Sequence, residues 1–240
     1  MTRIEAVIVA HGQPGDPDPQ QAAIEALAAR VAGLLPGATI RGATLAKDGA
    51  LGAALAGLAA PLVYPFFMAE GYFTRRVLPA RLAEIGAEIG AELGVQAARQ
   101  LPPFGTDPGL PALMLRAARV GAEAAGIAPG AATLVLAVHG SQVSATSKDS
   151  GLAMAEYLRR NAGFAAVAVG LIEEPPFLAD VARLPGPAIC LPFFALRAGH
   201  VATDIPAALA EAGFNGPLLP AIGEHADVPA LIAAALLSAG

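Results

Sequence analysis

Two of the four histidines in this sequence occupy the same kind of position. His11 and His139 each follow a short apolar run and each precedes a glycine. A neutral imidazole can accept a proton or bind a divalent metal ion, and glycine permits a tight turn with close approach of the backbone. Because the arrangement occurs twice, we interpret it as shared chemistry rather than as two unrelated strand ends.

The second half of the chain adds a further imidazole and a carboxylate to His139. His200 and the acidic pair Glu173 and Glu174 each follow another apolar run. Two imidazoles and a carboxylate suit a borderline divalent ion such as Co²⁺, Fe²⁺, Ni²⁺ or Zn²⁺. The sequence therefore predicts a metal site in the second half, with Glu173 and Glu174 as alternatives for its carboxylate.

The first half lacks this set of ligands. Residues 45–46 are apolar where the acidic pair would stand, and Tyr72 or Phe73 takes the place of His200. Aromatic rings stack on flat ligands and arginines pair with carboxylates, although such a loop could also be only solvated. We expect this half to contact substrate through His11, Tyr72, Arg75 and Arg76.

Two other polar residues receive structural interpretations. Asp204 precedes Ile205 and Pro206, and proline is well placed in the first turn of a helix. Asp204 is therefore interpreted as a residue that starts a helix. His225 precedes the last predicted helix and is interpreted as a loop or cap residue.

The elements that position these residues are themselves repeated, at a spacing of about 128 residues. The segment Pro65-Phe66-Phe67 has its counterpart in Pro192-Phe193-Phe194, and each is followed by a glycine and later by an apolar residue and proline. We expect two copies of one fold, an N-terminal lobe of residues 1–125 and a C-terminal lobe of residues 126–240.

Each copy alternates buried strands with helices. Apolar runs of four to eight residues without alternation indicate strands buried on both faces, and longer runs rich in Ala, Leu and Glu indicate helices. This order predicts an α/β fold with parallel sheets of about four strands per half, helices on both faces, and ligands beyond the carboxyl ends of the strands. The expected strands are 4–10, 62–67, 133–138, 167–172 and 188–193; the expected helices are 20–34, 78–93, 110–125, 150–161, 205–212 and 229–238.

Composition narrows the class of protein. With 55% hydrophobic residues and 15% charged residues, the chain is not expected to be disordered. Its net charge of −5 argues against binding of nucleic acid. The single cysteine excludes a disulfide framework. No apolar stretch is long enough for a membrane span, and the N-terminal one is too short for a signal peptide. We expect a cytoplasmic protein without an organic cofactor.

The motifs of the second half resemble those of the class II chelatases of tetrapyrrole biosynthesis, in particular the sirohydrochlorin cobaltochelatases and ferrochelatases. The resemblance rests on His139-Gly140-Ser141, on Leu171-Ile172-Glu173 with a following proline, and on Pro192-Phe193-Phe194 leading to Gly199-His200 and Asp204-Ile205-Pro206. It covers the whole chain, because family members occur as two fused copies. It implies two flavodoxin-like lobes with the active site between them.

The resemblance also implies an activity. A member of this family inserts a divalent metal, Co²⁺ or Fe²⁺ and possibly Ni²⁺, into a sirohydrochlorin-type macrocycle without ATP, in cobalamin or siroheme biosynthesis. His139 and His200 would then handle the metal, Glu173 would be their acidic partner, and Ser141 would join the substrate contacts. The only expected partner is the tetrapyrrole itself, bound by a monomer or homodimer.

Two other functions compete with this one. A protein of the same fold could bind a tetrapyrrole or a metal without turnover. Histidine phosphatases also place a histidine and glycine after a strand, but they need an arginine just before the histidine. Ala10 and Val138 stand at those positions, so the phosphatase reading is disfavoured.

Overall fold

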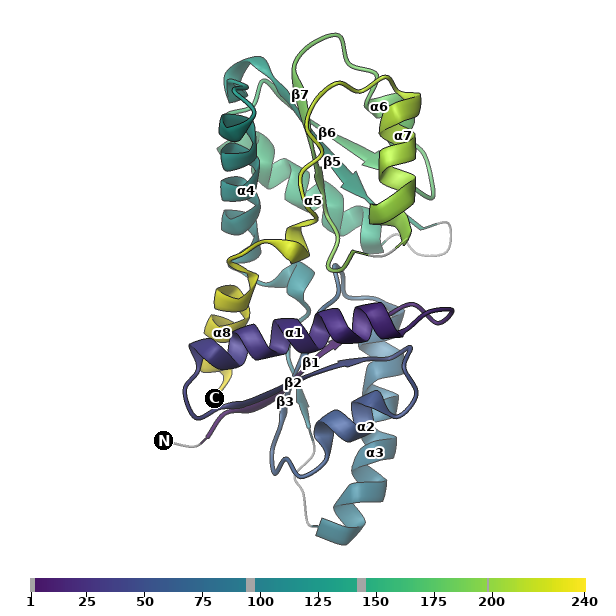
Figure 1. Ribbon diagram of the computed structural model, residues 1–240, viewed down its shortest axis with the longest axis vertical. Coiled ribbons are helices and arrows are strands. Elements are labelled where there is room, and N and C mark those ends of the chain that lie inside the picture. The colour runs from purple at the N-terminus through teal and green to yellow at the C-terminus, as the bar shows by residue number, and fades with distance from the viewer. Residues whose placement is uncertain (1–2, 94–97, 142–145, 198) are drawn as a thin grey trace. The chain divides into compact units, whose positions relative to one another are not determined.

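The computed structural model describes residues 3–93, 98–141, 146–197 and 199–240, and it forms two compact units (Figure 1). The first unit comprises Met1–Asp107 together with Ala226–Gly240, and the second comprises Pro108–His225. Each unit contains one parallel sheet flanked by helices. The predicted α/β class with two similar lobes is confirmed.

The sheet of the first unit has the strand order β2-β1-β3-β4, with all neighbours parallel. In its centre Ile8 pairs with Gly42 on one side and with Tyr64 on the other. Five of the six residues of the central strand are buried, which explains the unbroken apolar run in the sequence. The strands are β1 (Glu5–Ala10), β2 (Thr39–Thr44), β3 (Leu62–Pro65) and β4 (Arg99–Gln100).

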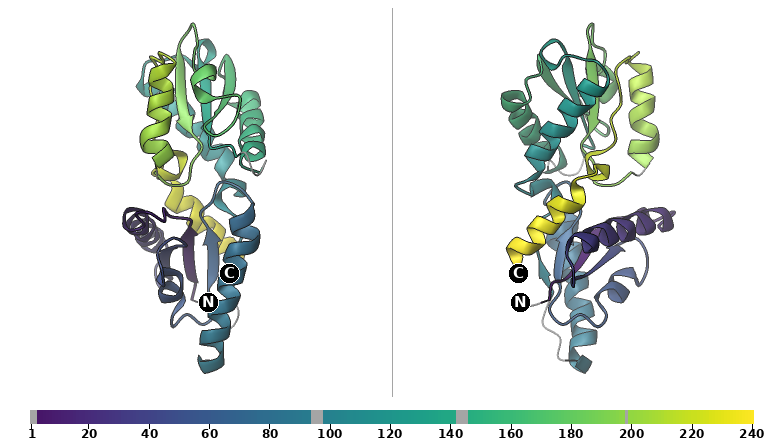
Figure 2. Two further views of the ribbon diagram at one scale, coloured as in Figure 1. Left: turned by 90° about the vertical axis from the view of Figure 1, so that its right-hand side faces the viewer. Right: turned by 60° about the vertical axis from the view of Figure 1, so that its left-hand side comes forward.

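Helices cover both faces of this first sheet. One face buries Val7, Val9 and Val63 against α2 (Ala50–Leu55) and α3 (Leu78–Leu93). The opposite face packs against α1 (Asp18–Leu34), which lies beside α8 (Val228–Ala239). Figure 2 shows the strands between α1 and α3.

The sheet of the second unit has the strand order β6-β5-β7, again parallel. Its strands are β5 (Thr133–Val138), β6 (Ala166–Leu171) and β7 (Ala188–Pro192). Among the described residues, three strands pair in full rather than the expected four. The place of a fourth is taken by Leu218, which makes a single bridge to Cys190.

The second sheet is covered in the same way. One face buries Val135, Ala137 and Cys190 against α6 (Leu178–Val181) and α7 (Ile205–Glu211). The other packs against α4 (Leu110–Ala124) and α5 (Thr146–Asn161). Gly151 of α5 leaves the room that the side chain of Val138 occupies.

The two compact units do not coincide with the two predicted lobes. Helix α4 belongs to the first half of the sequence but packs on β7, and α8 belongs to the second half but packs on α1 and β3. The last helix of each half therefore completes the other half's sheet. The division into residues 1–125 and 126–240 stays a prediction about the sequence repeat, while the folded units exchange these helices.

Most expected elements lie within about two residues of their predicted bounds, apart from α5, which begins four residues early at Thr146. The α-helices and β-strands that sequence reasoning did not name are β2, α2, β4 and α6, and it named none of the short 3-10 and π-helical turns. Strand β2 has the sequence TIRGAT and is an edge strand, so it carries no continuous apolar run. Within the described residues, no helix is both long and apolar enough to cross a membrane.

Candidate metal centre

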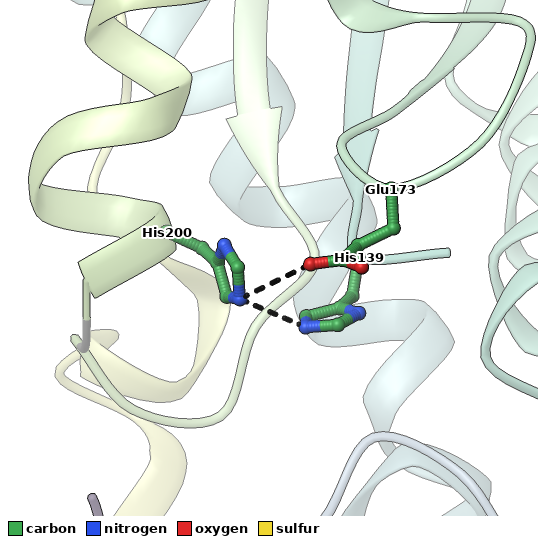
Figure 3. A group of neighbouring side chains, drawn as sticks. All are labelled: His139, Glu173 and His200. Atoms are coloured by element: carbon green, nitrogen blue, oxygen red, sulfur yellow. Dashed lines mark hydrogen bonds and ion pairs between the residues drawn. The ribbon is translucent and has the colours of Figure 1, made fainter. Parts of the chain in front are cut away.

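Three side chains meet at the carboxyl edge of the second sheet (Figure 3). His139 follows β5 directly, Glu173 lies two residues beyond β6, and His200 lies on the connection from β7 to α7. One ligand atom from each of the three lies within 4.8 Å of the others. Parallel strands bring these positions together because their carboxyl ends share one edge.

The two imidazoles face each other through their Nε2 atoms, which are 3.0 Å apart. The Nδ1 of His139 donates to the carbonyl of Gly140 at 2.6 Å, and the Nδ1 of His200 donates to the carboxylate of Asp204 at 2.6 Å. A neutral imidazole with a proton on Nδ1 has a lone pair on Nε2. Two lone pairs at this separation repel each other unless a proton or a cation lies between them.

A metal ion fits this separation. With metal–nitrogen bonds of about 2.1 Å, a nitrogen–nitrogen distance of 3.0 Å corresponds to an angle at the metal of about 90°. The Oε1 of Glu173 is 3.8 Å from the Nε2 of His200, which is within the span of about 4.2 Å that two such bonds can reach. The three residues therefore form a candidate site for one divalent ion.

The structure separates the two adjacent glutamates. Glu174 accepts hydrogen bonds from the backbone N–H of Ser141 at 3.0 Å and from the Nζ of Lys148 at 3.1 Å. The Ser141 N–H and the Lys148 ammonium hold the pKa of the Glu174 carboxyl below its usual value. Glu174 thus fixes the turn after His139, and Glu173 is the carboxylate that lies with the two histidines.

A π-helical turn, η4 (His200–Asp204), presents His200. The N–H of Ile205 donates to the carbonyl of His200, and π-turns of this kind are frequent at functional sites. Val201 and Ile205 are buried in the core of the second unit. Their burial anchors the turn, which leaves the His200 side chain about one-third exposed.

The glycine Gly223 clamps the loop that leads to this turn. Its N–H donates to the carbonyl of Phe194 at 3.0 Å. A Cβ at this position would lie only 2.7 Å from the Cα of Ala195, so no larger residue fits without displacing the loop. In the first unit Gly105 holds Phe67 and Met68 in the same way.

The first unit repeats the framework of the candidate metal centre but keeps only one of its three candidate ligands. A second π-turn, η1 (Phe73–Val77), follows β3, and its first residue identifies Phe73 rather than Tyr72 as the counterpart of His200. The ring of His11 meets that of Phe73 edge-on at 4.1 Å, as His139 meets His200 at 4.4 Å.

The backbone identifies the counterpart of Glu173 as Ala46. The N–H of Ala46 donates to the carbonyl of His11, just as the N–H of Glu173 donates to the carbonyl of His139. In the first unit the three positions of the candidate metal centre therefore carry a histidine, a methyl group and a phenyl ring, and only His11 could bind a metal.

The predicted substrate contacts fall in different units. His11, Tyr72, Arg75 and Arg76 belong to the first unit and Ser141 to the second. Tyr72 is 69% exposed and its ring lies 5.6 Å from that of Phe73, while Arg75 pairs with Glu70 at 2.7 Å.

Sequence reasoning named Phe73 only as one of two possible counterparts of His200, and it missed the contact of Asp204. Phe73 is the centre of a group of rings that also includes His11 at 4.1 Å and Phe67 at 6.2 Å. Asp204 bonds to His200, and their spacing of four residues is a signal that could have revealed the pair, because residues at i and i+4 face each other on a helix.

Comparison with known proteins agrees with this geometry. The family model described as CbiX matches residues 133–239, which contain the candidate metal centre. A search of curated protein sequences found no match. The chain is 50% identical to a solved structure described as CbiX, the terminal enzyme for biosynthesis of siroheme in denitrifying bacteria. That match covers 98% of this chain and 99% of the other, with a TM-score of 0.87.

More distant structures share the fold. SirB from Bacillus subtilis with Fe³⁺ has 13% identity and a TM-score of 0.77, covering 99% of this chain and 95% of SirB. DR2241 from Deinococcus radiodurans, described as structurally similar to chelatases, has 23% identity and a TM-score of 0.73, covering 98% of this chain and 55% of DR2241. The identity and coverage of the CbiX match place this chain in the CbiX family of class II tetrapyrrole chelatases.

Proposed function

We propose that this protein inserts a divalent metal ion, Co²⁺ or Fe²⁺, into a sirohydrochlorin-type tetrapyrrole without ATP, as a step of cobalamin or siroheme biosynthesis. The description of the 50%-identical relative as the terminal enzyme of siroheme biosynthesis supports the macrocycle and favours iron. The description of SirB as a sirohydrochlorin chelatase in complex with cobalt supports cobalt as a second candidate.

The observation that carries the proposal is the pair of facing Nε2 atoms, which are 3.0 Å apart. Both Nδ1 protons are fixed by acceptors, so both Nε2 atoms are available as ligands. The carboxylate of Glu173 adds a negative charge on the same side. This set of two neutral donors and one carboxylate suits Co²⁺ and Fe²⁺, and it contains no thiolate that would select a softer ion.

The chemistry follows from the charge balance. Insertion of a divalent ion forms metal–nitrogen bonds to the macrocycle and releases two pyrrole N–H protons. His139 and His200 would hold the ion and give it up as the pyrrole nitrogens replace them. Each imidazole that loses the metal regains a lone pair that can accept a proton. Glu173, whose side chain is 40% exposed, would pass these protons to solvent.

The first unit has a different part in this proposal. Ala46 and Phe73 replace two of the three candidate ligands, but Tyr72 offers an exposed ring, and Arg76 and Arg75, the latter paired with Glu70, offer two cations. Sirohydrochlorin carries many carboxylates, which arginine pairs well. We assign His11, Tyr72, Arg75 and Arg76 to contacts with the macrocycle, and Ser141 to contacts beside the metal.

An absorbance time course tests the activity. The protein is mixed anaerobically with sirohydrochlorin and Co²⁺, Fe²⁺ or Ni²⁺, against a control without protein. We expect a protein-dependent spectral change that continues over many equivalents of substrate. A change that stops at one equivalent would instead identify a tetrapyrrole or metal carrier, and no change with any metal would remove the proposed substrate.

Replacement of His200 tests the site. His200→Ala removes one of two facing ligands, so we expect metal insertion to be abolished while the folded state persists, because the ring is partly exposed and outside the core. Circular dichroism and thermal melting check the fold. Turnover at the wild-type rate in a folded variant would contradict the assignment of the site.

A further inference from the structure

Asp204 lies immediately before α7, and its side chain contacts His200 rather than the helix. It precedes α7, where an acidic residue commonly caps the helix by accepting a backbone N–H. Its side chain makes no such cap hydrogen bond. Its Oδ2 instead accepts the Nδ1 proton of His200 at 2.6 Å, and its Oδ1 accepts the hydroxyl of Thr203 at 2.9 Å.

The first unit shows what the fold requires at this position. The π-turn η1 has the same length as η4 and leads into a helix in the same way, with Val77 in the place of Asp204. The bond that closes the turn is also the same: Leu78 N–H to the carbonyl of Phe73, and Ile205 N–H to the carbonyl of His200. A carboxylate is therefore not needed to form the turn or to start the helix.

The internal comparison also shows which residues change together. Where the second unit has His200 with Asp204, the first has Phe73 with Val77. A phenyl ring has no N–H for a carboxylate to accept, and the carboxylate is absent from that copy. The presence of the acid where its partner is an imidazole, and its absence where the partner is a phenyl, ties Asp204 to the imidazole.

We propose that Asp204 is a positioning residue for the metal centre: it holds the proton of His200 on Nδ1 so that the Nε2 lone pair faces the metal. The Thr203 hydroxyl lies 2.6 Å from the carbonyl of Gly199 and 2.9 Å from Asp204 Oδ1, and the single proton that it shares between these two acceptors ties the carboxylate to the turn. A carboxylate behind a ligating histidine fixes its tautomer and orientation and makes it a better donor. The proposal rests on the proposed function, because it assumes that His200 binds the metal.

The direct test is the tautomer of His200 in the metal-free protein. Long-range ¹H–¹⁵N spectra report which ring nitrogen carries the proton, and with four histidines in the chain the signals can be assigned by single replacements. We expect Nδ1–H in the wild type and a shift toward Nε2–H in Asp204→Val, which installs the residue of the first unit. An unchanged tautomer in this variant would overturn the proposal.

The second test measures the affinity of the whole chain for Co²⁺ alone, by titrating the protein with the metal. We expect Asp204→Val and the isosteric Asp204→Asn to bind about 10–100-fold more weakly, the usual effect of removing such a partner. Asp204→Glu should recover part of the loss. Asp180→Asn, which removes an acid from the first turn of another helix, is the matched control and should bind like wild type.

The results separate this proposal from the proposed function. If His139→Ala and His200→Ala lose Co²⁺ binding but both Asp204 variants bind within twofold of wild type, the positioning role is wrong and the metal centre stands. If the histidine variants also bind like wild type, both proposals fail. If the affinity of the Asp204 variants falls only in proportion to a loss of folded protein in the melting curve, Asp204 is a structural residue and the proposal is overturned.

Discussion

Replacing Gly223 with alanine should weaken metal binding without touching any ligand. The added Cβ would lie 2.7 Å from the Cα of Ala195 and closer still to its carbonyl, whereas carbon atoms in contact are about 3.5–4.0 Å apart. The loop at Ala195 must therefore retreat by about 1 Å. His200 lies five residues further along the same connection, so we expect part of the displacement to reach the imidazole even though Val201 and Ile205 are buried.

How far a ligand can move before the metal is lost determines how much the affinity for Co²⁺ falls. Ligand distances in such sites agree within about 0.2 Å, so a shift of about 1 Å cannot be absorbed by bond stretching alone. We expect the affinity of Gly223→Ala for Co²⁺ to fall at least about tenfold, which corresponds to about 1.4 kcal/mol. Overpacking at a closed site should also lower the free energy of unfolding by about 1–3 kcal/mol.

Gly105→Ala is the matched control within the same chain. Its Cβ would lie 2.6 Å from the Cα of Met68, so the local strain is the same, but that loop leads to Phe73. We expect a similar loss of stability in urea unfolding and a Co²⁺ affinity within about twofold of wild type. Equal losses of affinity in both variants would mean that general destabilisation is the cause. Wild-type affinity in Gly223→Ala would refute the argument that the clamp positions His200.

Three further predictions concern single side chains. His139→Ala should abolish metal insertion and His11→Ala should reduce it less, as measured by turnover; a larger loss in His11→Ala would place the metal in the first unit. The pKa of Glu174 is lower in the folded protein than its ordinary value of 4.5. Glu174 therefore stabilises the fold at pH values above 4.5, and this contribution is lost as the pH falls through the folded-state pKa. Glu174→Gln should therefore be less stable than wild type at pH 6–7 and converge with it in acid, and a constant difference across the pH range would contradict this. Tyr64→Phe removes the buried hydrogen bond to Asp107 at 2.9 Å and should cost about 1–2 kcal/mol in urea unfolding, and no change would mean that Asp107 finds another donor.

The sequence predicted the parts of the fold that bury apolar surface on both faces. The central strands β1 and β5 were found at nearly their observed bounds because five of the six residues in each are buried. Strand β2 was missed because an edge strand needs fewer apolar residues. The side chain of Gln21 forms hydrogen bonds with the backbone groups at the outer edge of β2, accepting from the N–H of Thr44 and donating to the carbonyl of Gly42. Such a contact between distant residues leaves no local pattern in the sequence.

The candidate site divides in a similar way. His139, Glu173 and His200 could be placed together because the carboxyl ends of parallel strands share an edge. The choice between Glu173 and Glu174 could not be made from the sequence, because adjacent residues point in different directions and only packing decides which one faces the histidines. Here the backbone N–H of Ser141 binds the carboxylate of Glu174, which leaves Glu173 as the carboxylate beside the histidines.

The repeat provides an argument that neither copy gives alone. Both units keep the histidine after the first strand, the π-turn and the clamping glycine, so these features belong to the framework. Ala46 and Phe73 stand where the second unit has Glu173 and His200, so the candidate ligands are separable from that framework. Because the framework persists without ligands, loss of a ligand need not unfold the chain. This separability is why replacements in the metal centre can be interpreted as effects on chemistry rather than on folding.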